Sequence, residues 1–567
     1  SNKYDDTTTK AGYITDWKSS ANNVSSVTKN AAGQMRWVTD YDGAIEYKTE
    51  YAYDPSGNLE KQTQPNGDYI KYQYDDKNQL IEKKCYRKNG TETTLTIYRY
   101  NTSGNLTGMF DYTAGNGVWI PLRSEVTGYD SLQRRVSYTA VDGTDQLTQL
   151  NMSNSKITYG YDKENRLIKV TYPKQKGLKS MSFDYNGNGW LVKVTGSIQG
   201  VGEKTLQEYT YNRFGSVETV TDSLEYLSGG DRKLVKSYEY DDLQRVVKME
   251  YTDSKKLDTN NQPKVKESYS YEYDKGSQIT KEIQENRWSD QVGEQSTKTT
   301  NYEYNRLGML VKSQEISKIG TQSDQTKQTT YEYDHAGNCT TKNENGQVTT
   351  NVYNARNQLI TSNDVVVTTY QYDANGNQTK VMNDYKDTID YQYDVENRLI
   401  QVESDKVRGD KYHTYYIIEK QENAYNANGQ RIRKSWYSST NGNQTQSETK
   451  QYFYEGSSVL YTTSGSNIGM NVADLVYLHG VSGNVILTEE QNRDGQLFSY
   501  GYTKDIRGSS KNLIDNSGQV LVEYGYDDYG QTSIPVGNTV QNEIMYTGGI
   551  YDKETSQYYL NARYYNP

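Results

Sequence analysis

The sequence contains few of the residues that build disulfides and metal centres. Its 567 residues include 2 cysteines and 3 histidines. Cys85 and Cys339 lie far apart without metal-ligand spacing, so we interpret them as two unpaired, half-buried side chains, although the sequence leaves a disulfide open. The histidines, His335, His413 and His479, are scattered and too few to predict a histidine-based active site or a metal centre.

An excess of positive charge and long apolar runs are also missing. The chain has 63 basic and 73 acidic residues and a net charge of −10, which argues against nucleic acid as the main partner because phosphate binding needs clustered Lys and Arg. No apolar run approaches the roughly 20 residues of a membrane helix, so no membrane span is predicted. Ser1–Lys10 lacks the apolar stretch of a signal peptide. Export signals therefore lie upstream on a longer parent protein, or the chain is an excised piece; we favour the second.

The low apolar content would by itself indicate disorder, since mean hydropathy is −1.00. Tyrosine changes this interpretation. The chain has 58 tyrosines and only 5 phenylalanines, and the tyrosines recur at fixed places. Each ring can bury roughly 150 Å² or more while its hydroxyl finds a polar partner. We therefore predict a folded chain with thin layers that are wetted on both sides.

One motif recurs fifteen times, with a tyrosine followed by Asp or Asn and then a turn, as in Tyr51–Leu59 and Tyr159–Leu167. The spacing between copies runs from 19 to 33 residues. The tyrosine that precedes the Asp or Asn is at positions 53, 74, 100, 129, 161, 185, 211, 240, 273, 304, 333, 353, 372, 393 and 425. The unit is therefore constant at the turn and variable at its other end.

The turn chemistry can be followed residue by residue. The first turn position is Asp in nine copies and Asn in six, as a type I turn favours. The fourth position is Gly in eight copies and Asn in four, and both residues tolerate the left-handed backbone of a turn followed by a bulge. Gln133, Gln244 and Ser277 are the exceptions.

Apolar and polar residues alternate on both sides of the turn, which indicates strands. Each copy is thus predicted to be a β-hairpin, and the chain is predicted to be all-β. About thirty strands at ~4.8 Å spacing make a strip on the order of 140 Å long, and twist curls a strip of that length. We predict a long antiparallel β-hairpin spiral or solenoid that is hollow. Whether it closes around a cavity does not follow from the pattern.

These motifs resemble the YD-repeat, or rearrangement-hot-spot (RHS), family from about Tyr41 onward. The last hundred residues are similar to the RHS-associated core of that family. The segments that carry this second resemblance are Tyr477–Gly480, Tyr502–Ser509, Asp515–Val520, Tyr524–Gly530, Tyr546–Thr555 and Tyr558–Pro567. We accordingly divide the chain into an N-terminal lead-in (1–40), a YD-repeat spiral (41–455) and an RHS-associated core (456–567), truncated before any toxin domain.

The resemblance implies a β-shell like those of the Tc-toxin B–C cocoon, bacterial RHS polymorphic toxins, Gram-positive wall-associated proteins and animal teneurins. In the toxin members the shell encloses a variable C-terminal toxin, and some members carry aspartates that cut the toxin free. The chain stops at Pro567, so neither toxin nor cleavage residues are assigned. The first hypothesis is a shell that encloses and carries a C-terminal toxin. The alternative is a cell-wall or surface scaffold that binds glycans or partner proteins. Either one implies an extracellular or wall-associated location.

The repeated carboxylates invite two chemical interpretations, a glycan-hydrolysing pair or calcium loops. A simpler one is that each Asp caps its own turn, which explains every copy, whereas a catalytic pair should be singular. The Asp pairs at 75–76, 241–242 and 527–528 lack the spaced ligands of a calcium loop. We therefore assign no catalytic, cofactor-binding or metal-binding residues and predict that the chain is not an enzyme.

Aromatic side chains could also stack on sugar rings, although cross-strand tyrosine ladders are the commoner use. The tryptophans that could do so are Trp17, Trp37, Trp119, Trp190, Trp288 and Trp436. Asp111–Pro121, which contains Trp119, interrupts the repeat rhythm. This loop is either a binding protrusion or a harmless insertion, and we favour the insertion.

Overall fold

The computed structural model of the protein describes residues 14–18, 24–144, 155–173, 177–409, 414–465, 473–480, 485–491, 496–534, 540–561 and 563–567. Forty strands belong to one sheet, in which strands that follow each other along the chain pair antiparallel. Apart from two short 3₁₀ turns, the elements of the described residues are strands. The prediction of an all-β chain built on a long antiparallel sheet is confirmed. Nowhere in the described ranges is there a helix long and apolar enough to cross a membrane.

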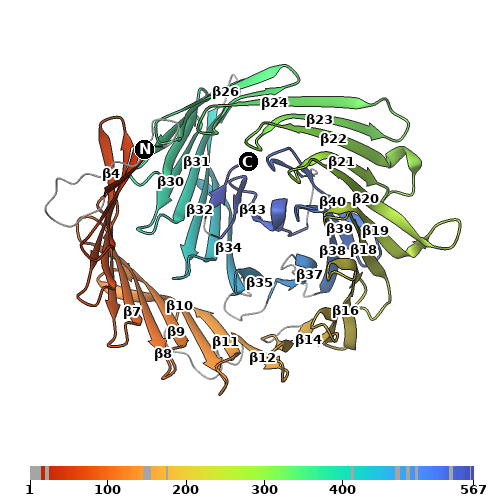
Figure 1. The fold of residues 1–567 in the computed structure, drawn as a ribbon, viewed down its shortest axis with the longest axis horizontal. Helices are drawn as coiled ribbons and strands as arrows, with labels where there is room; N and C mark the ends of the chain where they lie inside the picture. Colours follow the sequence, from red (N-terminus) through yellow and green to blue (C-terminus); the bar gives the residue numbers. More distant parts are fainter. Residues whose placement is uncertain are drawn as a thin grey trace. The chain divides into compact units, whose positions relative to one another are not determined.

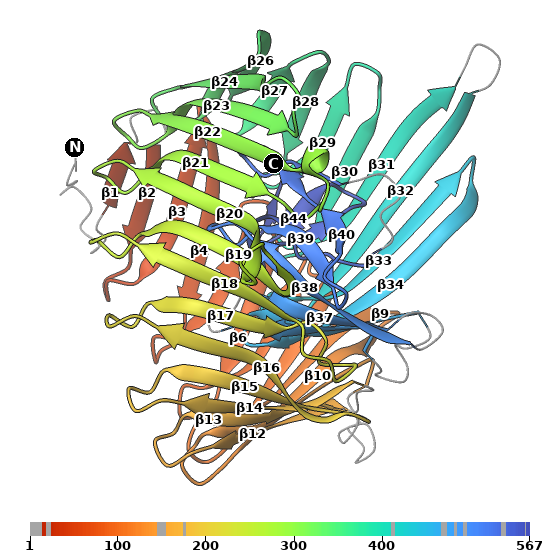
Figure 2. The ribbon, with the colours of Figure 1, turned by 90° about the vertical axis from the view of Figure 1, so that its right-hand side faces the viewer.

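The chain forms two compact units, each made of an early and a late stretch of sequence. Unit 1 contains residues 1–152 and 331–449, and unit 2 contains residues 153–330 and 450–567. These units are divisions in space, and the sequence boundaries at residues 40 and 455 stay predictions. Figures 1 and 2 label the strands of both units.

The early strands of unit 1 are β1 (Ile14–Lys18), β2 (Val24–Lys29), β3 (Met35–Asp42), β4 (Ile45–Tyr53), β5 (Leu59–Thr63), β6 (Tyr69–Tyr74), β7 (Leu80–Tyr86), β8 (Glu92–Tyr100), β9 (Leu106–Gly115), β10 (Val118–Tyr129) and β11 (Arg135–Asp142). Its late strands are β25 (Cys339–Glu344), β26 (Gln347–Tyr353), β27 (Leu359–Asn363), β28 (Val367–Tyr372), β29 (Gln378–Asn383), β30 (Thr388–Tyr393), β31 (Leu399–Gly409), β32 (Thr414–Tyr425) and β33 (Arg431–Thr440). Two strands run across the unit boundaries, β24 (Gln325–Tyr333) and β34 (Asn443–Glu455).

The early elements of unit 2 are β12 (Lys156–Tyr161), β13 (Leu167–Thr171), β14 (Leu178–Tyr185), β15 (Leu191–Ile198), β16 (Gly202–Tyr211), β17 (Val217–Ser223), β18 (Lys233–Tyr240), β19 (Val246–Leu257), β20 (Pro263–Tyr273), β21 (Ile279–Asn286), η1 (Val292–Glu294), β22 (Ser296–Tyr304) and β23 (Leu310–Ile319). Its late elements are β35 (Ser458–Ser464), β36 (Leu475–His479), β37 (Val485–Gln491), β38 (Leu497–Lys504), β39 (Ser510–Asp515), β40 (Val520–Glu523), β41 (Gly525–Tyr526), β42 (Thr532–Ser533), η3 (Tyr546–Gly548), β43 (Ile550–Asp552), β44 (Gln557–Tyr559) and β45 (Tyr564–Tyr565).

Each of the fifteen motifs forms the same five-residue turn between paired strands. In the first copy, the Gly57 N–H donates to the Asp54 carbonyl over 3.0 Å, and the Asp54 N–H donates to the Asn58 carbonyl over 2.9 Å. The Asn58 N–H also donates to the Asp54 carboxylate over 2.8 Å. Asp54 therefore caps its own turn, as the turn-capping interpretation predicts.

The fourth turn residue is left-handed in all fifteen copies, with φ between 59° and 94°. Gln133, Gln244 and Ser277, which the sequence marked as exceptions, adopt this conformation as well. The left-handed backbone costs a residue with a Cβ roughly 1–2 kcal/mol. The turn hydrogen bonds and the paired strands on both sides offset this cost, so the repeat holds its geometry without Gly or Asn.

The tyrosine before each turn links its hairpin to the preceding one. In the first copy the pairing register shifts between Ala52 and Tyr53, where Tyr53 faces Leu59, and this bulge recurs in the later copies. In twelve copies the tyrosine hydroxyl donates to the carbonyl six residues after the preceding motif's tyrosine, at the bulge, over 2.6–3.0 Å. These tyrosines are at positions 74, 100, 129, 185, 211, 240, 273, 304, 353, 372, 393 and 425. Phenylalanine could fill the space but could not make this bond.

Side chains at the end of one turn also reach the next turn. The Asn58 amide donates to the Asn78 side-chain oxygen over 2.9 Å, and the Gln278 amide donates to the Gly308 carbonyl over 2.9 Å. The Arg245 guanidinium likewise reaches the Asp274 carbonyl over 3.1 Å. Hydrogen bonds thus join successive turns into a row that runs across the sheet at one end of the strands.

In each unit the late stretch lies against the early one. The hydrogen bonds that join them span 301–316 residues of sequence in unit 1. In unit 2 the span falls from 311 residues at Leu178 to 215 residues at Ser313. Along the late stretch of unit 2, later residues therefore contact early strands that are nearer to them in the sequence.

The tyrosine ladder generates a test. Tyr273→Phe removes the hydroxyl that donates to the Val246 carbonyl over 2.6 Å and leaves that acceptor without its partner. We expect a loss of about 1 kcal/mol of stability, measured as a lower thermal midpoint by calorimetry. Tyr385→Phe is the control, because Tyr385 is 69% exposed. Equal midpoints for the two variants would show that the ladder contributes nothing.

Candidate functional site at the contacts between early and late strands

The residues that could carry chemistry are dispersed in the structure. Cys85 and Cys339 are both free; Cys339 is half-buried, as predicted, but the prediction was wrong for Cys85, which is fully buried. Within the described ranges no three His, Cys, Asp or Glu side chains gather as a metal site would require. His413 lies outside the described residues, and so does the side chain of Trp17. The contacts between early and late strands are therefore the places where polar and charged side chains converge.

In unit 1 the turn 394–398, between β30 and β31, is seated on the early strands. Val395, at its second position, is 1% exposed and packs with Ile70 of β6 and Cys85 of β7. Beside it, the Lys83 ammonium lies 2.7 Å from the Glu396 carboxylate, and the Lys83 side chain is 8% exposed. One small apolar side chain and one nearly buried ion pair thus fasten the late strands here.

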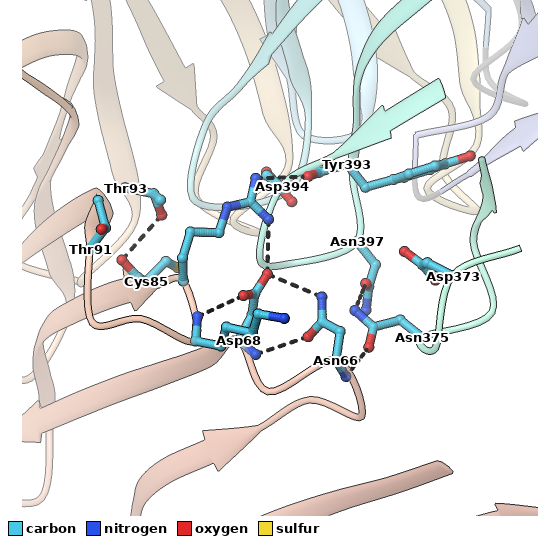
Figure 3. Close-up of polar contacts among 12 residues, drawn as sticks. Asn66, Asp68, Cys85, Thr91, Thr93, Asp373, Asn375, Tyr393, Asp394 and Asn397 are labelled. Atoms are coloured by element: carbon cyan, nitrogen blue, oxygen red, sulfur yellow. Dashed lines mark hydrogen bonds and ion pairs between the residues drawn. The ribbon is translucent and has the colours of Figure 1, made fainter. Parts of the chain in front are cut away.

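The neighbouring turns extend this contact through a polar network (Figure 3). The Asn66 N–H, in the turn between β5 and β6, donates to the Asn375 side chain over 3.1 Å, and the Asn375 amide donates to Asn397 over 2.8 Å. Arg87 links the early and late strands, because its guanidinium donates to Asp68 over 2.8 Å and to the Tyr393 carbonyl over 3.1 Å. Each of these bonds holds a turn in place.

Two buried carboxylates receive the next late turn, 426–430. Asp111 of β9 accepts the Thr96 hydroxyl over 2.8 Å and the Ala427 N–H over 3.1 Å. Glu125 of β10 accepts the Asn426 amide over 3.0 Å. Burial, together with the nearby Glu125 charge, raises the pKa of Asp111 to about 6, although the Thr96 hydrogen bond opposes this shift.

Asp111 is a strand residue, and the sequence prediction was wrong about its surroundings. Asp111–Pro121 is not a loop but the end of the β9–β10 hairpin, in which Val118 pairs with Gly115. The strands β9 and β10 are longer than those of most repeats. The segment therefore resembled an interruption when only the repeat length was considered.

The second turn residue is a signal that the sequence reasoning missed. In the four late turns that contact early residues this position is small or apolar, namely Ala355, Ala374, Val395 and Ala427. In the other eleven copies it is Pro55, Asp76, Thr102, Ser131, Lys163, Gly187, Arg213, Asp242, Lys275, Arg306 or His335. A turn that must lie against a sheet cannot bury a charged side chain at its tip without a partner. A charged residue or histidine at this position therefore marks a solvent-facing turn, whereas a small or apolar residue is found in the four seated turns and also at the exposed Pro55 and Gly187.

In unit 2 the late strands are fastened by buried polar groups. Glu489 of β37, 2% exposed, accepts the Leu178 N–H over 3.2 Å and the Tyr226 hydroxyl over 3.0 Å. Glu267 of β20, fully buried, accepts the Asn512 amide over 2.9 Å and the Trp288 indole N–H over 3.1 Å. These carboxylates lie on different strands, and their acceptor positions are used to hold neighbours.

The turn 505–509 also lies against early strands. Lys504 occupies the position before the turn at which the repeats have tyrosine. The Tyr251 hydroxyl donates to the Lys504 carbonyl over 3.0 Å and accepts the Lys504 N–H over 2.8 Å. Arg507 pairs with Glu282 over 3.1 Å. Burial lowers the pKa of the Lys504 ammonium to about 7, with the nearby Lys236 charge acting in the same direction. This lysine is 5% exposed and lies within packed structure instead of a cleft.

A cavity of about 280 Å³ lies among the late strands of unit 2, lined in part by Val459, His479, Ile544, Tyr559 and Leu560. His479 Nε2 lies 2.8 Å from the Val459 carbonyl oxygen. The described lining contains no Asp, Glu, Lys, Arg or Cys side chain. It therefore offers no acid–base pair of the kind that hydrolysis of a glycan requires.

Known proteins resemble the chain in both sequence and fold. The family model described as RHS Repeat matches residues 53–88. The chain is 34% identical over 269 residues to the tRNA3(Ser)-specific nuclease WapA of Bacillus spizizenii, which is 47% of this chain and 10% of that protein. It is 23% identical over 592 residues to the double-stranded DNA deaminase toxin A of Burkholderia cenocepacia, with 96% of this chain and 38% of that protein covered.

The solved TcdB2–TccC3 structure matches this chain with a TM-score of 0.59 at 16% sequence identity. The match covers 96% of this chain and 30% of the TcdB2–TccC3 chain. The Photorhabdus luminescens Tc holotoxin pore covers 96% of this chain and 29% of its own with a TM-score of 0.56 at 15% identity. The chain contains an RHS repeat, and its fold is similar to that of these Tc-toxin structures. It spans about 10% of the length of the WapA nuclease, so that protein's activity does not by itself describe this RHS-repeat chain.

Buried carboxylates give the RHS-repeat chain a defined pH dependence. Burial raises the pKa of Asp222 to about 7, and of Glu489 and Glu490 to about 6 and about 7. Between about pH 4 and these values the folded state binds more protons than the unfolded state, so stability falls as the pH rises. The turn aspartates act in the opposite sense, because the Asn58 hydrogen bond lowers the pKa of Asp54. Their contribution is lost as the pH falls below about 4.

We therefore expect the thermal midpoint to be higher at pH 5 than at pH 8. Asp222→Asn tests one group, because Asn keeps an oxygen to accept the Gln207 amide, which lies 2.6 Å from the carboxylate. At pH 8 this variant should be more stable than the native chain by on the order of 4 kcal/mol, and at pH 4 the two should nearly agree. A difference that does not change with pH would contradict the assignment.

The seated turn generates a second test, which uses Cys85 as its reporter. Burial raises the pKa of this thiol to about 11, so it should react slowly with a disulfide reagent while the turn is seated. In a Cys339→Ser background, Val395→Asp places a charge among Ile70 and Cys85 and should raise the Cys85 labelling rate at least tenfold. Val365→Asp is the control, because Val365 is 79% exposed. Native-rate labelling in Val395→Asp would refute the anchoring role.

Proposed function

We propose that this chain is a structural shell segment of an exported RHS-repeat protein, which encloses and carries a C-terminal toxin domain and performs no catalysis itself. The observation that carries the proposal is the fastening of late strands onto early ones in both units, by Val395 and Lys83 in unit 1 and by Glu489 and Glu267 in unit 2. Contacts of this kind build a wall of stacked segments. They use the buried polar groups for cohesion instead of chemistry.

The relatives support a carrier role. The WapA nuclease and the DNA deaminase toxin are named for activities on nucleic acid, and each is much longer than the part that this chain matches. A division between a repeat region that forms the wall and a separate region that carries the activity fits those lengths. An extracellular or cell-wall-associated location belongs to the same proposal.

The path of the C-terminal residues also fits a carrier. The turn 527–531 contacts β23 through a hydrogen bond between Asp528 and Ser313. The last strand, β45, pairs with β44, and the Tyr565 hydroxyl donates to the Tyr529 carbonyl. The end of the chain is therefore held against the sheet of unit 2, where an attached domain would remain close to the wall.

Protease protection tests the proposal. One small, protease-sensitive reporter domain is fused after Pro567 and, in a matched second fusion of the same chain, before Ser1. We expect the C-terminal reporter to survive at least ten times longer than the N-terminal one, and Val395→Asp to shorten its lifetime. Equal digestion of the two reporters would refute enclosure. Specific signals for the native chain on a glycan array would then favour the alternative role of a wall or surface scaffold.

A further inference from the structure

One row of turns in unit 2 has apolar tips that project into solvent. The turns 212–216, 241–245, 274–278 and 305–309 follow the strands β16, β18, β20 and β22. At the third turn position, Phe214, Leu243 and Leu307 are 61%, 69% and 80% exposed. In eleven of the fifteen motifs this position is Ser, Lys, Glu, Asn, Gly, Ala or Arg, and Leu132 is the one other large apolar residue there. Three such residues within four consecutive turns form a cluster that the fold itself does not require.

The row is rigid. The Gln244 side chain accepts hydrogen bonds from Asn212 over 3.2 Å and from Ser216 over 3.2 Å. Arg245 donates to the Asp274 carbonyl over 3.1 Å, and Gln278 donates to the Gly308 carbonyl over 2.9 Å. Adjacent turns are two strands apart, about 10 Å, so the three apolar tips span roughly 30 Å along one sheet edge.

Cations accompany the apolar tips. Arg213, Lys275 and Arg306 occupy the second position of three of the four turns and are exposed, with Asp242 as the single acidic residue at that position. Within the described part of the chain none of these three cations has an ion-pair partner. The Arg213 guanidinium lies 4.6 Å from the centre of the Phe214 ring, so the charge and the apolar tip are presented together. With Arg245 and the carboxylates Asp241, Asp242 and Asp274 included, the four turns carry a net charge of +1, on a chain whose net charge is −10.

We propose that this row, Arg213–Phe214, Leu243, Lys275 and Arg306–Leu307, is a docking edge for an anionic lipid surface. Apolar tips that enter the acyl boundary while adjacent cations meet anionic headgroups are the two components of interfacial binding. Tips about 10 Å and about 20 Å apart, with charges between them, cannot form the continuous apolar core of a protein interface. A fluid lipid surface accepts each tip separately. The edge rests on the membrane and does not span it, and the proposal stands independently of the carrier role.

Vesicle flotation of the 567-residue chain tests the proposal. With phosphatidylcholine vesicles containing 30% phosphatidylserine at 0.1 M salt, we expect binding that phosphatidylcholine alone does not support. The triple variant F214S/L243S/L307S should reduce the partition coefficient at least tenfold. The variant R213Q/K275Q/R306Q, or 0.5 M salt, should reduce binding to the anionic vesicles. Val365→Ser removes an apolar side chain that is 79% exposed in unit 1, and it should bind as the native chain does.

Several outcomes would overturn the proposal. They are an absence of binding to anionic vesicles, native-like binding by the triple serine variant, and an equal loss in Val365→Ser. Sedimentation velocity of the native chain and the triple serine variant tests whether a second copy of the chain binds to this row instead. A dimer that the triple variant abolishes would assign the edge to a second copy of the chain and would also overturn the proposal.

Discussion

The structure depends on the hydrogen bond from each repeated tyrosine hydroxyl to a backbone carbonyl of the preceding hairpin. The turn after the tyrosine forces a bulge, and the bulge takes a carbonyl out of the regular strand ladder. The hydroxyl of the next tyrosine meets that carbonyl, for example from Tyr273 to Val246 over 2.6 Å. Because an unsatisfied carbonyl inside a layer is costly, the bulged turn and the tyrosine require each other. This mutual requirement explains why tyrosine, and not phenylalanine, occupies the position before the turn.

The same repeat performs two tasks, and the second turn residue separates them. Where the position is Ala or Val, the turn is seated on early strands, as Val395 is between Ile70 and Cys85. Where it is Arg, Lys or Asp, the turn faces solvent, as at Arg213 and Arg306. The polar groups around a seated turn, such as Lys83 and Glu396, are fixed by their partners. The buried carboxylates Glu489 and Glu267 are likewise acceptors that hold neighbouring segments.

The sequence predicted local structure well because local structure here is set by residues within one repeat. The Asp cap, the left-handed fourth position and the alternating strands all follow from side chains that lie within nine residues of each other. Gln244 and Ser277 marked the limit of this reasoning, since the surrounding hydrogen bonds override their own preference. Asp111–Pro121 marked another limit, because longer strands there resemble an interruption when only the repeat length is considered.

By itself the sequence determined an all-β chain of antiparallel hairpins, the identity of its turns and its resemblance to the RHS-repeat family. Only the tertiary structure decided which turns are seated and which face solvent. It also decided that Asp111, Glu125, Glu267 and Glu489 are buried fasteners. The physical reason is range: a turn is specified by neighbours a few residues away, whereas these contacts join residues 215 to 316 positions apart. No repeat-level pattern encodes a partner at that distance, so the burial and the shifted pKa of each fastener emerge only when the late strands meet the early ones.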